Sequence, residues 1–140
     1  MSFTRIFANI EHLLREIYAL DKLTTHDLWW HARWYWDCGT LFWYDNWRGV
    51  STGVCLIKVF NDIKDIDRFY IHQPEGKYIK IEELVSHSKG TLGGLLEKAL
   101  IWCPRDVIIW DRGERTIKGE PRMYTWFDFE RLARRFAYGR

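Results

Sequence analysis

The stretch that decides the fold runs from Lys77 to Arg112 and reads KYIKIEELVSHSKGTLGGLLEKALIWCPRDVIIWDR. Its first part, Tyr78 to Val85, has the composition of a strand, and its last part, Val107 to Trp110, is a short apolar strand. Between them a glycine-containing loop leads into a helix that Pro104 ends. Fewer than forty residues suffice for a crossover that joins two parallel strands. The sequence therefore predicts these two strands as parallel neighbours in one sheet.

The segments on either side of this stretch predict further helices and strands. Apolar residues between Ile6 and Tyr18 recur with helical spacing, and Thr24 or Thr25 can cap a second helix that ends near Gly39. The remaining predicted elements are a hairpin of Leu41–Tyr44 and Val54–Phe60, a strand at Met123–Trp126, and a helix at Phe129–Phe136. The expected fold is α+β, one domain over residues 1–140, with a mixed sheet of about five to six strands and helices on both faces.

Composition limits the partners and the compartment. The chain has 140 residues, is 47% hydrophobic and carries a formal charge of +2, which selects neither nucleic acid nor an anionic membrane. No apolar run approaches the length of a membrane span, and the N-terminus lacks the layout of a signal peptide, so we expect a cytoplasmic protein. Cys38, Cys55 and Cys103 lie in apolar stretches and read as buried thiols.

The nine tryptophans are the unusual feature of the composition. Six of them lie between Trp29 and Trp47, and the helix that contains Trp30 and Trp34 is apolar on nearly all sides. Burial in the core is the expected reason, because aromatic side chains bury large areas. A surface platform for stacking bases or sugars is the alternative, although no basic run is interleaved with these residues.

The order of elements and the stretch from Lys77 to Arg112 resemble the GNAT acyltransferase superfamily. In that superfamily the strand equivalent to Tyr78–Val85 pairs with the pantetheine arm of acyl-CoA, and the following loop and helix N-terminus hold the pyrophosphate. The resemblance implies acetyl-CoA or another acyl thioester as the cofactor. The residues that would bind it are Leu84, Val85, Lys89, Gly90, Thr91, Gly93 and Gly94.

The glycine loop departs from the usual pattern of that superfamily, because Thr91 and Leu92 stand between Gly90 and the Gly93-Gly94 pair. Two interpretations of these glycines are therefore open. They can let backbone N–H groups approach a phosphate, or they can let the helix pack closely on the sheet.

One GNAT-like subgroup, the toxin-activating lysine acyltransferases, resembles the N-terminal half more closely. In this subgroup a histidine precedes the hairpin and an acidic residue lies on the strand before the glycine turn. His26 and Glu82 match these two positions, which implies a base and an orienting carboxylate for acyl transfer to an amine. Tyr124 stands in for the general acid. Because Glu82 and Glu83 are consecutive on a strand, we expect them to face opposite sides of the sheet.

The sequence thus predicts a small GNAT-like acyltransferase that moves an acyl group from acyl-CoA or acyl carrier protein to an amine acceptor. The alternative is a GNAT-shaped binding or assembly module without catalysis, such as a phage virion or host-interaction protein, because compact aromatic-rich versions of this fold are typical of phage genomes. The histidines lack ligand-type partners at helical spacing, so no metal site is expected.

Overall fold

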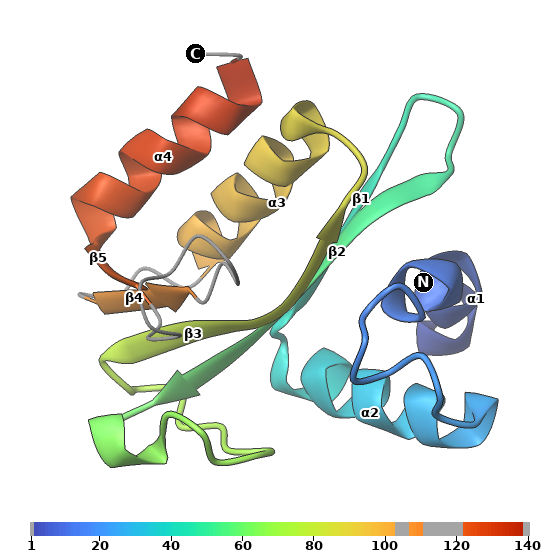
Figure 1. Ribbon diagram of the computed structural model, residues 1–140, viewed down its shortest axis with the longest axis horizontal. Helices are drawn as coiled ribbons and strands as arrows, with labels where there is room; N and C mark the ends of the chain where they lie inside the picture. Colours follow the sequence, from blue (N-terminus) through green and yellow to red (C-terminus); the bar gives the residue numbers. More distant parts are fainter. Residues whose placement is uncertain (1, 103–106, 111–121, 139–140) are drawn as a thin grey trace.

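The protein is described by a computed structural model that covers residues 2–102, 107–110 and 122–138. The N-terminal half contains two helices, a hairpin and a single 3-10 turn, and the C-terminal half contains three strands and two helices in the order β3, α3, β4, β5, α4 (Figure 1). The elements are α1 (Phe3–Leu14), α2 (Thr25–Cys38), β1 (Leu41–Asp45), β2 (Ser51–Phe60), η1 (Ile63–Asp65), β3 (Tyr78–Ser86), α3 (Lys89–Trp102), β4 (Val107–Trp110), β5 (Arg122–Thr125) and α4 (Trp126–Tyr138).

The strands form one five-stranded sheet in the order β1-β2-β3-β4-β5. Neighbouring strands are antiparallel except β3 and β4, which are parallel and pair from Tyr78 with Val107 to Ile81 with Trp110. The predicted α+β class and the predicted parallel pair are both confirmed. The connecting helix α3 begins at Lys89, earlier than expected, because Ser88 caps it: its Oγ accepts the N–H of Thr91 at 3.1 Å.

Helices cover both faces of the sheet and create two separate cores. In Figure 1, α1 and α2 lie on one side of the sheet, and α3 and α4 lie on the other. Alternation along β2 supplies both cores, since Val54 and Leu56 pack toward α1 and α2, whereas Ile57 and Val59 pack toward α3 and α4. The side of the sheet that a strand residue faces can therefore be assigned from the core that it joins.

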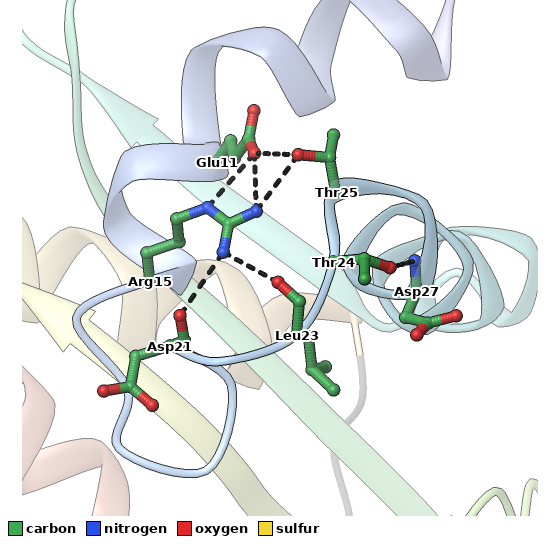
Figure 2. Close-up of polar contacts among 7 residues, drawn as sticks. All are labelled: Glu11, Arg15, Asp21, Leu23, Thr24, Thr25 and Asp27. Carbon is green, nitrogen blue, oxygen red and sulfur yellow. Dashed lines mark hydrogen bonds and ion pairs between the residues drawn. The ribbon is translucent and has the colours of Figure 1, made fainter.

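Arg15 fixes the connection between α1 and α2. Figure 2 shows its guanidinium group between the last turns of α1 and the first turn of α2. It pairs with Glu11 at 3.0 Å, donates to the carbonyl oxygens of Leu23 at 3.0 Å and Asp21 at 3.4 Å, and donates to Thr25 Oγ1 at 3.2 Å. Five donors in a planar group suit such a convergence of acceptors. Arg15 thereby holds the start of α2 against the end of α1.

The aromatic helix α2 is largely covered, as expected. Thr24 caps its start by accepting the N–H of Asp27, and Gly39 ends it in the left-handed conformation at φ 73°. The side chains of Trp29, Trp34 and Trp36 are half-buried, so packing accounts for most of these indoles. Trp30 differs, since 56% of its surface is exposed.

Two further expectations are corrected or limited by the structure. The last strand ends at Thr125, and Trp126 begins α4, because Thr125 Oγ1 accepts the N–H of Asp128 and caps the helix. Cys55 is buried and Cys38 is half-buried, whereas Cys103 lies outside the described residues. Among the helices that the structure describes, none combines the length and the apolar character that crossing a bilayer requires.

We predict that Gly76→Ala lowers the free energy of unfolding by about 1–3 kcal/mol. A Cβ at Gly76 would lie 2.5 Å from the backbone carbonyl of Phe60, and β2 would have to move to make room. The control is Gly90→Ala, where a Cβ meets nothing within 4 Å and the first turn of α3 gains helix propensity. Urea unfolding measures both variants, and equal stability of the two would contradict the prediction.

Candidate functional site

A β-bulge in β3 places two carboxylates on one face of the sheet. Leu56 pairs with Glu83 and the next residue, Ile57, pairs with Ile81, so Glu82 is an extra residue on β3. Glu83 contacts His31 on α2, and Glu82 contacts Lys58, which alternates with the α3-facing residues of β2. Both carboxylates therefore face α2. The expectation that Glu82 and Glu83 point to opposite sides is wrong, because it assumed an unbroken strand.

His31 and Glu83 form an enclosed acid–base pair on this face. His31 Nε2 lies 2.9 Å from Glu83 Oε2, and their side chains are only 10% and 15% exposed. The other ring nitrogen, Nδ1, lies 3.0 Å from the hydroxyl of Tyr70. A carboxylate that accepts the Nε2–H proton fixes the neutral imidazole in the tautomer whose Nδ1 is basic. The arrangement is a base with an orienting acid on one side and a hydroxyl on the other.

Tyr70 reaches His31 from an unusual backbone conformation. Its φ is 54°, in the left-handed region that residues other than glycine rarely adopt. Its ring contacts both Trp34 and His31, with centroid distances of 5.4 and 5.8 Å. Burial, followed by the charge of Glu83, raises the pKa of the Tyr70 phenol. The hydroxyl therefore keeps its proton and can donate it to Nδ1.

Tyr35 packs against His31, with ring centroids 5.3 Å apart, and stays neutral. The residue is 5% exposed, and burial raises the pKa of its phenol well above the usual value, with the charges of Glu83 and Glu82 adding to the effect. A phenolate at this position would be both desolvated and repelled. Tyr35 thus gives the site a neutral, apolar floor.

Glu82 is occupied by two lysines. Its Oε1 lies 2.7 Å from Lys58 Nζ, and its Oε2 lies 3.7 Å from Lys80 Nζ. The Lys58 side chain is 3% exposed, and its ammonium group also donates to the backbone carbonyls of Asp65, at the end of η1, and of Ile66 and Arg68, which follow it. A buried cation needs such partners. Glu82 therefore balances the charge that anchors the loop before Tyr70.

The three predicted catalytic residues are not brought together. His26 lies on the exposed first turn of α2, where its Nε2 accepts the Trp30 Nε1–H at 3.2 Å. Tyr124 is on the opposite side of the sheet, with its ring 5.7 Å from that of Phe129 in the core under α4. Its buried hydroxyl has no hydrogen-bond partner among the described residues. His26, Glu82 and Tyr124 thus occupy three separate environments.

The sequence contained a signal for His31 that the interpretation of α2 did not use. His31 lies three residues after Leu28 and four before Tyr35, and these two residues, with Ala32, form the buried face of the helix. His26 is five residues from His31, which turns it about 140° around the helix axis. Helical spacing alone could therefore have placed His31 toward the sheet and His26 toward solvent.

The predicted cofactor residues lie at the end of β3 and the start of α3. Leu84 packs toward α3 and Val85 toward α1, and both belong to the part of β3 that continues beyond its last pair with β4 at Ile81. Lys89 and Gly90 are exposed at the first turn of α3. Thr91 is buried, and its hydroxyl bonds Thr52 on β2 and Ser88, which draws α3 against the sheet.

The paired glycines pack the helix against the sheet. A Cβ at Gly94 would lie 2.5 Å from the ring of Tyr44, and Gly93 is buried. Gly90 faces open space. The close-packing interpretation thus accounts for Gly94, whereas Gly90 is the glycine that leaves the helix start accessible to a ligand.

Comparisons of the chain with protein-family models, with curated proteins and with solved structures give no match. Within the described ranges, 2–102, 107–110 and 122–138, no group of three or more histidine, cysteine, aspartate or glutamate side chains is placed to hold a metal ion.

We predict that Glu82→Gln lowers the free energy of unfolding by about 1–3 kcal/mol, because it removes the negative charge between Lys58 and Lys80 and leaves a buried ammonium without its counter-ion. The matched control is Glu75→Gln, in the exposed turn before β3. Urea unfolding at neutral pH checks both. If Glu82→Gln were as stable as the control, the structural role assigned to Glu82 would be wrong.

The raised pKa of Tyr35 predicts a loss of stability in alkali. The unfolded chain ionises this phenol near its ordinary pKa of about 10, whereas the folded protein keeps it protonated, so the contribution is complete below about pH 10 and is lost as the pH rises above it. Tyr35→Phe removes the ionisable phenol and with it this pH-dependent contribution to the free energy of unfolding. Its free energy of unfolding, relative to its own value at neutral pH, should fall less steeply above about pH 10 than that of the wild type. If the free energy of unfolding fell equally with pH in the two proteins, Tyr35 would not be the group whose ionisation destabilises the fold in alkali.

Proposed function

We propose that the protein is a GNAT-like acyltransferase that moves an acyl group from a CoA or carrier-protein thioester to an amine. We further propose that His31 is its general base and that Glu83 orients it. One observation carries the proposal: His31 Nε2 lies 2.9 Å from Glu83, on the segment of β3 that extends past its pairing with β4. The base assigned from the sequence, His26, is thereby replaced by His31.

The donor side of the proposal rests on the ends of β3 and α3. Glu82 to Ser86 continue β3 beyond Ile81, and among the described residues no strand pairs with the second backbone edge of this segment, which is where an extended thioester arm would lie. Beside it, the start of α3 offers the N–H groups of Lys89 and Gly90 and the Lys89 ammonium group, which favour an anion such as a phosphate.

The chemistry assigns a role to each group around His31. The acceptor nitrogen attacks the thioester carbonyl, the C–N bond forms, and the C–S bond breaks to release the thiolate. The nitrogen passes a proton to the Tyr70 oxygen while Tyr70 donates its own proton to His31 Nδ1. Glu83 stabilises the imidazolium through Nε2–H, the thiolate takes a proton from solvent, and the imidazolium returns its proton to solvent, which restores neutral His31. Tyr35 supplies a floor without charge.

The second candidate is a binding module without catalysis, and exposed aromatic residues favour it. Trp30, Phe69 and Trp47 are 56%, 82% and 86% exposed. On the α4 side of the sheet, Trp110, the last residue of β4 that pairs with β3, is buried, and its ring lies 6.0 Å from that of Phe129. A module of this kind would bind a partner through its aromatic surface and would show no response to thioesters.

Thermal unfolding with acetyl-CoA, palmitoyl-CoA and free CoA separates the two candidates. A ligand at about 100 times its dissociation constant stabilises by roughly 2.7 kcal/mol, which is several degrees in Tm for a domain of this size. We expect at least one acyl-CoA to raise Tm. No shift with any of these compounds would favour the non-catalytic module.

For the catalytic step, we predict that His31→Gln and Glu83→Gln each reduce acyl transfer to a lysine-containing peptide by about 100-fold or more, because each removes part of the acid–base pair. The measurement is thiol release from the acyl-CoA that gives the largest Tm shift. His26→Gln is the matched control on the same helix and should retain activity. A loss in the His26 variant together with full activity in the His31 variant would overturn the assignment.

A further inference from the structure

A groove separate from the His31–Glu83 pair lies at the free edge of the sheet. It has a volume of about 420 Å³ and lies where the end of α2 meets β1 and the second half of α3. β2 separates β1 from β3, which carries Glu83, so the groove is a second location on the molecule. Its lining residues are Trp36, Gly39, Leu41, Phe42, Trp43 and Lys98.

The walls of the groove are aromatic. The rings of Trp36 and Trp43 are 6.0 Å apart and tilted by 35°, and they form one continuous apolar wall. Gly39 ends α2 at φ 73° without a side chain, and a Cβ there would meet nothing within 4 Å, so the mouth stays open at this point. The volume falls within the range of small-molecule pockets, roughly 300–1,000 Å³.

Lys98 is the only charged residue of this lining. Its ammonium group donates to the Trp43 carbonyl oxygen at 2.6 Å and lies 5.8 Å from the ring centroids of Trp43 and Tyr44. An ammonium group has three N–H donors, so two are available to an anion at the mouth of the groove. The ion pairs between described residues include none with Lys98.

The same contact disfavours a peptide strand as the occupant. The Ile57 N–H bonds the Thr40 carbonyl, so alternation along the ladder turns the backbone groups of Leu41 and Trp43 to the open edge. Lys98, which extends from α3, already occupies the Trp43 carbonyl, so a strand added at this edge would have to displace the lysine to form that hydrogen bond. A small ligand is compatible with this contact.

We propose that this groove binds a small amphipathic carboxylate, with an aliphatic chain against Trp36 and Trp43 and its carboxylate on Lys98. The apolar lining accounts for the chain, and the Lys98 ammonium group, which has no ion-pair partner among the described residues, accounts for the charge. The site is independent of acyl transfer, because none of its residues contacts His31 or Glu83 in the interactions that define that pair.

Isothermal titration with decanoate tests the proposal, with decanol and decylammonium as probes of the same chain length. We expect decanoate to bind saturably at one site, decanol to bind at least tenfold more weakly, and decylammonium to show no saturable binding, since the ammonium group of Lys98 attracts only the carboxylate. Lys98→Met should weaken decanoate binding about 10-fold or more, and Lys98→Arg should retain most of it. Lys22→Met, in the exposed connection between α1 and α2, is the control and should bind normally.

Three results would overturn the proposal: no saturable decanoate binding, equal binding of the three probes, or a Lys98→Met variant within twofold of the wild type. The comparison of decanoate with decanol uses the unmodified protein, so the proposal stays testable if a variant fails to fold. If a thioester raises Tm equally in the wild type and in Lys98→Met, the thioester binds without Lys98, which supports the separation of the groove from the His31–Glu83 site.

Discussion

The extra residue in β3 is the constraint on which the candidate site depends. Without it, the alternation of a strand would send Glu82 and Glu83 to opposite faces, and only one could approach α2. With it, the pairing moves from Ile57 with Ile81 to Leu56 with Glu83, and both carboxylates share the face that α2 covers. One then binds the structural lysines and the other binds His31.

Glu82 and Glu83 have different roles because they bind different partners. Glu82 balances Lys58, whose ammonium group also holds the backbone between Asp65 and Arg68. That segment leads directly to Tyr70, which reaches His31 from a left-handed backbone conformation. The buried ion pair and the acid–base pair are therefore coupled through the loop. Arg15 also contributes, because its contacts hold the start of α2, the helix that carries His31.

The helices and strands could be predicted from the sequence, whereas the register between β2 and β3 could not. Helical periodicity located α1 and α2, the turn chemistry of Thr24 and Gly39 located the ends of α2, and the short crossover predicted the parallel pair β3 and β4. The bulge could not be predicted in the same way, because it is a property of the pairing between β2 and β3 and has no local signature at Glu82. The position of His31 could have been predicted, since the spacing of Leu28 and Tyr35 identifies the buried face of α2 and places His31, not His26, next to it.

The central claim is that Glu83 holds neutral His31 in the form protonated at Nε2, so that Nδ1 is the basic nitrogen. Site-assigned ¹⁵N NMR of the histidine rings tests this most directly, because the two tautomers give different nitrogen shifts and couplings. The account predicts a protonated Nε2 and an unprotonated Nδ1 for His31, with this preference lost in Glu83→Ala. A His31 ring protonated at Nδ1 in the neutral form, or a tautomer unaffected by the loss of Glu83, would contradict it.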